Sequence, residues 1–168
     1  MVTDVTVYFV TIKAHTVDFK LESFLPYRLN QAAERVSQRF AAQYRLRYHM
    51  TRPEWRALAA IGTYGRMTAT EIGANSSMHK TKVSRAVRAL EEKRWLKRAE
   101  HAEDRRVEHL ELTPAGKRIY GEMIELAKAY ELELATLLGA SGLRQLEAGL
   151  AAIEVKMASE TSRRGPKD

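Results

Sequence analysis

The amino-acid sequence predicts a mainly α-helical protein with one small β-hairpin. From position 23 onward, apolar residues recur mostly three or four positions apart, the spacing that places side chains on one face of a helix. Two Thr-x-x-Glu sequences, at 51–54 and 68–71, have the pattern of a capping box that starts a helix. One stretch, 95–112, has apolar residues on both sides of a charged centre, as expected for a two-stranded hairpin.

The composition is typical of one globular domain and excludes several kinds of site. Of the 168 residues, 45% are hydrophobic and 29% are charged, which is ordinary for a folded protein. The chain has no cysteine, so disulfides, thiolate metal sites and thiol redox sensing are excluded. Its five histidines lack metal-ligand spacing, and we expect no metal and no cofactor. No apolar run has the ~18 residues of a membrane span, and no basic signal-peptide start is present, so we expect a cytoplasmic protein.

The positive charge of the chain is concentrated in one segment. The formal net charge is +7, and residues 75–106 hold ten Lys or Arg against five Asp or Glu, an excess of +5. A local excess indicates a binding surface for a polyanion, such as nucleic acid or an anionic membrane, rather than general solubility charge.

The N-terminal part consists of an extension, 1–22, and a predicted helix, 23–50. Residues 5–12 are β-prone but have no hairpin partner nearby, so an extended or disordered arm, a lone strand and an extension from an upstream start all stay open. Pro26 fits the first turn of the helix. The apolar face of this helix consists of Leu25, Leu29, Ala33, Val36, Phe40 and Tyr44.

Residues 51–113 carry the pattern of a helix-turn-helix lobe. A helix starts at the first capping box and stops at Gly62, and a short helix follows the second box. The polar run 75–77 ends that short helix and offers an N-cap for a basic helix that ends at Leu90. A short helix, a polar turn and a basic helix, in that order, form a helix-turn-helix. The buried stripe of the basic helix consists of Val83, Ala86, Val87 and Leu90.

The opposite face of the basic helix carries hydroxyl and guanidinium groups, on Thr81, Ser84, Arg85 and Arg88. Arg can bond guanine at two points, and Ser or Thr can donate or accept, so these side chains suit the major groove of DNA. A solvated helix face is the alternative for an isolated basic helix. The neighbouring motifs favour DNA binding.

A hairpin follows directly, with strands predicted at 95–100 and 107–112 and a charged tip at 101–106. A hairpin in this position is called a wing. An Arg at its tip can enter the minor groove, where the potential is most negative, and a neighbouring Asp can orient the guanidinium.

Residues 114–160 are predicted to form two helices. Thr113 and Pro114 supply the N-cap and first helical position, and an apolar seam then continues until Gly139-Ala-Ser-Gly142. The residues 161–168 are polar and charged, and we expect them to be disordered. The last helix has a heptad seam suited to helix-on-helix packing, formed by Leu143, Leu146, Leu150, Ile153 and Met157.

Together, these residues resemble the MarR family of winged helix-turn-helix regulators over about 24–157. The most specific sequences are Lys80-Thr-Lys-Val-Ser-Arg-Ala-Val-Arg-Ala-Leu-Glu-Glu-Lys93, Asp104-Arg-Arg106 and Leu112-Thr-Pro-Ala-Gly116. The resemblance implies a homodimer, with 23–50 and 114–160 as its dimerisation region and 51–113 as its DNA-binding lobe. His79, where many relatives carry Asp, and the extension 1–22 depart from the family pattern.

The resemblance also implies roles for single residues. In the basic helix, Thr81, Ser84, Arg85 and Arg88 would face the major groove, with Lys80 and Lys82 nearer phosphates. At the wing tip, Arg105 or Arg106 would enter the minor groove, oriented by Asp104. Family members often hold an effector between the first two helices and the fifth, and the corresponding residues here are Tyr27, Arg28, Tyr44, His49, Trp55 and Arg56.

These candidate effector residues offer aromatic faces and cations, which suit an aromatic carboxylate. Tyr44 and Trp55 also fit core-packing positions, and that alternative stays open.

We therefore expect a dimeric, sequence-specific DNA-binding transcriptional regulator of a pseudo-palindromic operator, in particular a repressor relieved by a small aromatic or anionic ligand. The alternatives are a dimeric ligand-binding or protein-interaction module and a non-specific architectural DNA binder. We do not expect an enzyme, because the sequence lacks a Gly-rich phosphate loop, a G-x-S-x-G sequence and a metal-spaced cluster.

Overall fold

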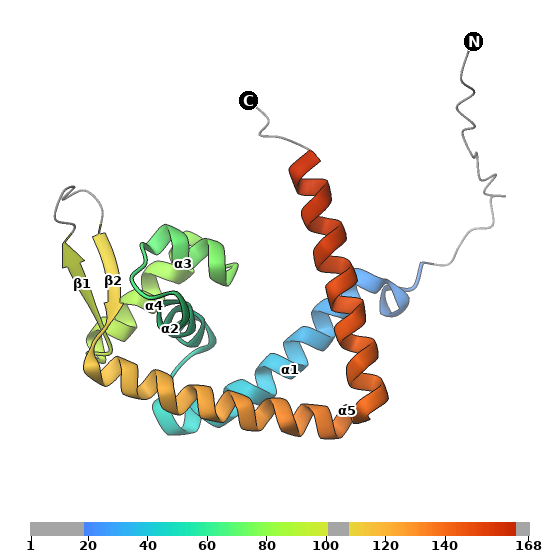
Figure 1. Ribbon diagram of the computed structural model, residues 1–168, viewed down its shortest axis with the longest axis horizontal. Coiled ribbons are helices and arrows are strands. Elements are labelled where there is room, and N and C mark those ends of the chain that lie inside the picture. Colours follow the sequence, from blue (N-terminus) through green and yellow to red (C-terminus); the bar gives the residue numbers. More distant parts are fainter. Residues whose placement is uncertain (1–18, 101–107, 164–168) are drawn as a thin grey trace, which may run out of the picture. The chain divides into compact units, whose positions relative to one another are not determined.

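The computed structural model describes residues 19–100 and 108–163, which form helices and one two-stranded sheet (Figure 1). The mainly helical class with a small hairpin is confirmed. The chain divides into two compact units, Met1–Arg39 and Phe40–Asp168. No helix in the described ranges is long and apolar enough to cross a membrane.

A single 3-10 turn, Leu21–Ser23, precedes the long helix α1, Leu25–Tyr48, of which the part up to Arg39 belongs to the first unit. The Ser23 hydroxyl donates to the carbonyl of Lys20 at 2.8 Å and closes the turn. The apolar side chains at the start of α1 are exposed to solvent, among them Leu25 and Leu29. The predicted arm or strand at 5–12 lies outside the described residues.

The second unit contains the predicted helix-turn-helix lobe. It is built from α2 (Arg52–Tyr64), α3 (Ala69–Ser76) and α4 (Lys80–Glu92). Both predicted capping boxes are formed, so that the Thr51 and Thr68 hydroxyls accept from the main-chain N–H groups three residues later. These caps satisfy N–H groups that the first turn of a helix leaves without a partner.

Two predicted helix boundaries were wrong. Helix α2 continues through Gly62 to Tyr64, because Gly62 is needed there for packing: a side chain at this position would clash with the ring of Tyr120. The glycine that ends α2 is Gly65, whose φ of 82° lies in the region that favours glycine.

The second wrong boundary is the predicted N-cap of the basic helix at 75–77. These residues finish α3 instead, because the side chains of Asn75 and Ser76 bond back to α3 carbonyls at 2.9 and 2.5 Å. Ser77 takes the left-handed conformation that ends the helix. His79 therefore holds the N-cap position of α4, without a side-chain cap bond.

The hairpin consists of β1 (Leu96–Glu100) and β2 (Glu108–Leu112), paired antiparallel with Leu96 opposite Leu112. Met67, in the α2–α3 loop, exchanges two main-chain hydrogen bonds with Leu110, at 3.1 and 2.7 Å. This contact anchors the strands to the helices, and the hairpin's tip lies outside the described residues.

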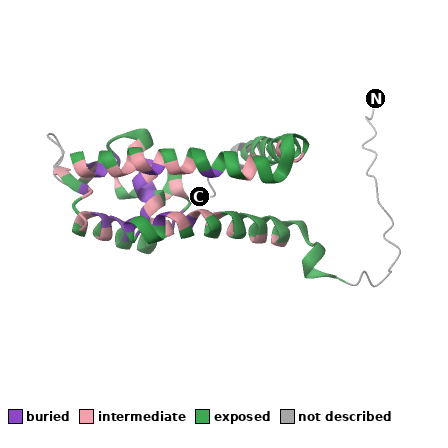
Figure 2. Cartoon of the chain, turned by 90° about the horizontal axis from the view of Figure 1, so that it is seen from below, coloured by how far each residue is buried: buried purple, intermediate pink, exposed green. Residues whose placement is uncertain are grey.

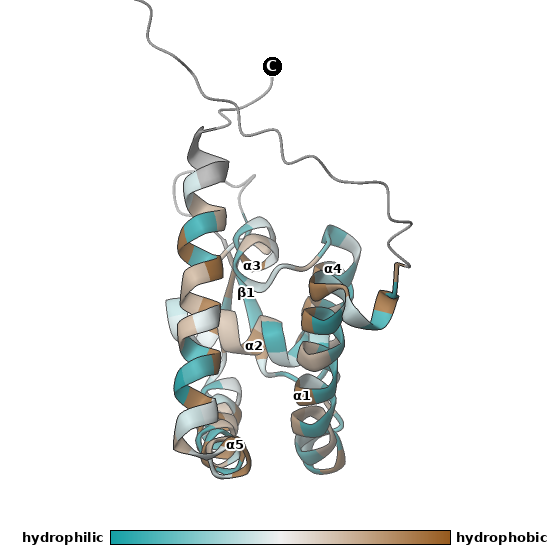
Figure 3. Cartoon of the chain, turned by 90° about the vertical axis from the view of Figure 1, so that its right-hand side faces the viewer, coloured by the Kyte–Doolittle hydropathy of each residue, from teal (hydrophilic) through white to brown (hydrophobic). Residues whose placement is uncertain are grey.

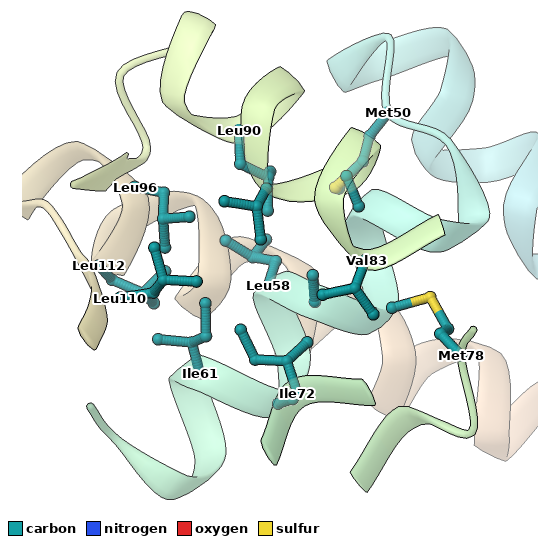
Figure 4. Packing of buried hydrophobic residues seen from close by; sticks show 14 of the residues in the cluster. Met50, Leu58, Ile61, Ile72, Met78, Val83, Leu90, Leu96, Leu110 and Leu112 are labelled. Atoms are coloured by element: carbon teal, nitrogen blue, oxygen red, sulfur yellow. The ribbon is translucent and has the colours of Figure 1, made fainter. Parts of the chain in front are cut away.

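A single core joins the helices of the lobe to the hairpin. Side chains from α2, α3, α4 and both strands converge on it (Figure 4), and the predicted stripe of α4 is buried in full. In Figure 2 the buried residues gather on the inward faces of the helices, and solvent-facing positions are exposed. The labelled core residues are Met50, Leu58, Ile61, Ile72, Met78, Val83, Leu90, Leu96, Leu110 and Leu112.

The last described element is α5, Pro114–Arg163, which is interrupted at Gly139. Gly139 has φ 67° and ψ 163°, so the helix kinks there and resumes at once. The predicted break at 139–142 is therefore confirmed but is shorter than predicted. Beyond the kink, hydrophobic and hydrophilic residues alternate along the helix (Figure 3). The exposed apolar seam there includes Leu146, Leu150, Ile153 and Met157.

Candidate nucleic-acid interface

The outward face of α4 has the character predicted for a DNA-reading surface. Its apolar stripe is buried against the lobe, which fixes the opposite face toward solvent. All six predicted DNA-contacting residues of this helix are exposed: Lys80, Thr81, Lys82, Ser84, Arg85 and Arg88. The face therefore presents four cations and two hydroxyls with no apolar side chain between them.

The cations on this face differ in their local partners. Arg88 donates from Nε to Glu92 at 3.0 Å, a pair one turn apart on the same helix. In the described part of the chain, Lys80, Lys82 and Arg85 have no carboxylate within salt-bridge distance. Their charges are therefore available to an external anion, and the Nη groups of Arg88 stay available beside its pair with Glu92.

Lys93, one of the ten cations in the basic segment, has an internal role. Its Nζ donates to Glu54 at 2.5 Å and to the carbonyl of His49 at 2.8 Å. Glu54 is only 7% exposed and also accepts from the main-chain N–H of Thr51 at 3.3 Å. Lys93 thus joins the end of α4 to the α1–α2 corner, a role that charge counting alone cannot reveal.

Arg98 is also engaged internally, at the base of the wing. Its Nε and Nη2 donate to the two carboxylate oxygens of Glu91 in α4, at 2.8 and 3.0 Å. Its Nη1 donates to Glu108 in β2. The hydrogen bond with Glu91, and the negative charges of both glutamates, raise the pKa of the Arg98 guanidinium. The guanidinium therefore links three elements of the lobe.

A cleft of about 660 Å³ opens beside α4, between α3 and the hairpin. Its floor is apolar, with Val83, Val87 and Leu110 among its residues, and its rim carries Lys80, Ser84 and Arg98. Two of these rim residues, Lys80 and Ser84, are predicted DNA contacts, so the cleft borders the candidate interface.

The predicted contacts at the wing tip, Asp104, Arg105 and Arg106, lie outside the described residues, and their roles stay predictions. Among the described residues, no three His, Asp or Glu side chains are placed to hold a metal ion.

The candidate effector residues lie in several different surroundings. Tyr44 is buried in an aromatic cluster, with its ring 5.1 Å from Phe40 and 6.2 Å from Trp55 between centroids. Burial raises the pKa of the Tyr44 hydroxyl, although the positive charges of Arg52, Arg45 and Arg56 oppose that rise. Arg45 and Arg52, and the ring of Tyr130 that stacks on Phe40, are features of this cluster that the sequence did not single out.

The remaining candidate effector residues are distributed as follows. Tyr27 and Arg28, in the first unit, line a hollow of about 550 Å³ on the first turns of α1. Trp55 and Arg56 line another, of about 380 Å³, between α2 and the end of α3. His49 adopts a positive φ of 47° at the α1–α2 corner. Their ligand-binding role stays a prediction.

Comparison with known proteins identifies the lobe. Residues 49–107 match the MarR family. A comparison with curated protein sequences finds no match. The MarR family transcriptional regulator SPO1453 from Silicibacter pomeroyi is similar in structure, with a TM-score of 0.67, 24% identity, and coverage of 81% of this chain and 98% of that one.

Two further solved structures share the fold. BpsR from Bordetella bronchiseptica, whose DNA binding is regulated by 6-hydroxynicotinic acid, has a TM-score of 0.70, 18% identity, and coverage of 81% and 96%. NadR in complex with 4-hydroxyphenylacetate has a TM-score of 0.64, 20% identity, and coverage of 78% and 92%. The family match therefore covers the helix-turn-helix lobe, and these solved structures share the winged helix-turn-helix fold of the chain.

Proposed function

We propose that this protein is a dimeric, sequence-specific DNA-binding repressor that a small aromatic or anionic ligand releases from DNA. The observation that carries the proposal is the outward face of α4, where six polar or cationic side chains are exposed opposite a fully buried stripe. The helix is thereby held rigidly by its back while its polar face stays free, which is what insertion into a major groove requires.

On this face, Arg85 is the best placed residue for reading a base. It lies in the middle of the exposed face and has no carboxylate partner among the described residues, so it can chelate guanine without first breaking an ion pair. Lys80 and Lys82, in the first turn of α4, suit the phosphates that flank the groove. Thr81 and Ser84 add short hydroxyl contacts.

The proposed dimer is supported by apolar surface left exposed beyond the lobe. The heptad seam of α5 beyond Gly139 is solvent-exposed, and such a seam is stabilised when a second helix covers it. A two-fold dimer would present two copies of α4 to half-sites centred about one helical turn of DNA apart. We assign 23–50 and 114–160 to dimerisation and 51–113 to DNA binding.

At the wing, we propose that Arg105 or Arg106 enters the minor groove and that Asp104 orients the guanidinium. An Arg in a narrow minor groove gains from its strong negative potential. This contact would extend each half-site beyond the bases that α4 reaches.

The proposed effector is a hydroxylated aromatic acid. BpsR responds to 6-hydroxynicotinic acid and NadR binds 4-hydroxyphenylacetate, and both compounds pair an aromatic ring with a carboxylate. In this chain, the positive charges of Arg52, Arg45 and Arg56 act on the buried hydroxyl of Tyr44, where the charge of Glu54 opposes them. Cations beside aromatic side chains suit that ligand chemistry. Release of DNA by the ligand would follow if the ligand favoured a lobe arrangement that cannot span two half-sites.

Fluorescence anisotropy with labelled DNA tests the proposal. The purified protein is titrated into DNA from its own upstream region and into a scrambled duplex of equal length, at several salt concentrations. We expect tight binding to the native fragment alone, which persists as salt rises and weakens when hydroxylated aromatic acids are added. Arg85→Ala should weaken native binding and relax the preference for one base pair.

Two other results would redirect the assignment. Equal and steeply salt-sensitive binding to both duplexes would indicate a non-specific architectural DNA binder. No DNA binding, together with a stable dimer that binds aromatic acids, would indicate a ligand-binding or protein-interaction module. Turnover of an added compound would contradict the expectation that the protein is not an enzyme.

A further inference from the structure

The ion pairs of Arg98 connect the two parts of the lobe that the proposed function places on DNA. Arg98 lies in β1, Glu91 lies in the last turns of α4, and Glu108 lies at the start of β2. The two bonds to Glu91 use parallel N–H groups of the guanidinium and both carboxylate oxygens. This two-point geometry fixes orientation as well as distance, because the guanidinium and the carboxylate are both planar.

Arg98 lies on the hairpin at the level where the buried apolar residues of the described strands end. Side chains alternate between the two faces of a strand, so Arg98 and Glu108 share the core-facing side with Leu96 and Leu110. The buried hairpin residues of the described chain, Leu96, Leu110 and Leu112, all lie level with Arg98 or further from the tip. At that level, the described contacts between the hairpin and α4 include the ion pair of Arg98 with Glu91, beside the pair of Arg98 with Glu108.

We propose that Glu91 and Glu108 are positioning residues for DNA binding, which act through Arg98 to hold the wing at a fixed angle to α4. This inference rests on the proposed function. The wing and the recognition helix then approach DNA as one rigid unit, with the angle between them set before binding. Preorganisation of this kind raises affinity, because less conformational freedom is lost when the complex forms.

The charges of the two glutamates make the proposal testable, because it predicts a change in DNA affinity opposite to the change that overall charge predicts. Both carboxylates lie on the lobe that approaches phosphates, so neutralising either one should strengthen DNA binding if only overall charge matters. The proposal predicts the opposite: Glu91→Gln should weaken operator binding although the protein becomes more positive. Side chains of Glu91 and Glu108 are 27% and 61% exposed, so both substitutions should leave the fold intact.

Glu111→Gln is the matched control. Glu111 lies on β2, three residues from Glu108, and pairs with Lys97 at 2.9 Å on the opposite face of the hairpin. Its substitution changes the net charge by the same amount as Glu91→Gln or Glu108→Gln, without touching Arg98. Arg98→Lys is the complementary variant, since it retains the positive charge but replaces the planar guanidinium with a single ammonium group.

The experiment uses the full chain and an operator that the wild-type protein selects from random DNA. Anisotropy should show operator affinity falling about fivefold in Glu91→Gln and Arg98→Lys, and rising about twofold in Glu111→Gln. A comparison of the affinity for operators with A·T flanks and with G·C flanks tests the wing contact, since the minor groove is narrow in A·T tracts. The preference for A·T flanks should decline in Glu91→Gln while the preference at central base pairs is retained.

Binding by Glu91→Gln that is as tight as that of Glu111→Gln, with unchanged flank preference, would overturn the positioning role of Glu91 and leave the regulator proposal standing. A wild-type chain that selects no operator would overturn both. Thermal unfolding of each variant separates a misplaced wing from an unfolded lobe. A lower unfolding midpoint in Glu91→Gln, together with an equal loss of preference at central base pairs, would also count against the positioning role of Glu91.

Discussion

The winged lobe and the part of α5 beyond Gly139 bury their apolar residues to very different extents. In the lobe, Leu58, Ile72 and Leu90 are fully buried. Beyond Gly139, Leu150 is 45% exposed and Met157 54% exposed, although both lie on a regular heptad seam. The lobe therefore completes its own core, whereas the end of α5 offers an apolar surface that a second helix can cover.

This difference indicates which sequence features stabilise each region. The lobe has capping boxes, a glycine that permits close packing and a nearly buried ion pair within its own chain. The end of α5 carries apolar residues at heptad positions that stay exposed. We expect substitutions in the lobe to lower the free energy of unfolding, and seam substitutions to act on assembly.

The largest effect is expected from Gly116→Ala. A methyl group at this position would clash with the main-chain carbonyl of Trp95, and a backbone atom cannot move aside as a flexible side chain can. The free energy of unfolding should fall by about 3 kcal/mol, as measured by urea denaturation. Gly121→Ala is the control, because it has no atom near the added methyl group, and alanine there should stabilise α5 by roughly 0.5–1 kcal/mol. Equal effects would contradict close packing at Gly116.

A second substitution, Leu150→Glu, tests the other side of the comparison. It places a charge in the exposed seam, so it should raise the dimer dissociation constant about a hundredfold without unfolding the lobe. Sedimentation equilibrium measures the assembly, and circular dichroism measures the fold. Val155→Glu, also exposed but outside the heptad positions, should change neither; a similar loss of assembly in both variants would place the interface elsewhere.

Glu54→Gln should have an intermediate effect within the lobe. It removes the charge that Lys93 faces and weakens the capping of α2. Since the Lys93 side chain is 25% exposed, water can solvate part of its charge, and we expect a loss of about 2 kcal/mol. Glu92→Gln is the control, because Glu92 pairs with Arg88 on the solvent-exposed surface, and it should leave the unfolding midpoint unchanged. If Glu54→Gln leaves the free energy of unfolding unchanged, then the pair with Lys93 does not stabilise the α1–α2 corner.

The smallest effect is a pH dependence at the second capping box. Hydrogen bonds from the main chain and side chain of Thr68 lower the pKa of the Glu71 carboxyl. A carboxyl whose pKa is lower in the folded state contributes stability above its unfolded pKa, and loses it as pH falls through the folded value. The difference in melting temperature between wild type and Glu71→Gln should therefore shrink between pH 7 and pH 3. A difference in melting temperature that does not change with pH would indicate that packing, and not the charge of Glu71, causes it.

The exposed cationic face of α4 was largely predictable from the sequence because it depends on local rules. Helical spacing fixes which residues share a face, so the buried stripe at Val83 and Leu90 also determined that Ser84, Arg85 and Arg88 face outward. The capping boxes were predictable for the same reason, since both partners lie within four residues.

The two wrong helix boundaries arose where distant packing or competing caps decided. Gly62 looked like a helix end, but Tyr120, far along the chain, requires a residue without a side chain inside α2. Asn75 and Ser76 have side chains that can cap either helix, and in the folded chain they bond to α3. A local pattern carries no information about either outcome.

The sequence by itself determined the order of elements, the cationic face of α4 and the position of the α5 break, because each depends on residues within a few turns of one another. Tertiary structure alone decided which of the described cations lack a carboxylate partner. Lys93 and Arg98 cannot be told from Lys82 and Arg85 by composition, yet folding brings carboxylates to the first two and none of the described ones to the others. Charge pairing depends on distances of a few ångströms between residues far apart in sequence, and those distances exist only in the folded chain.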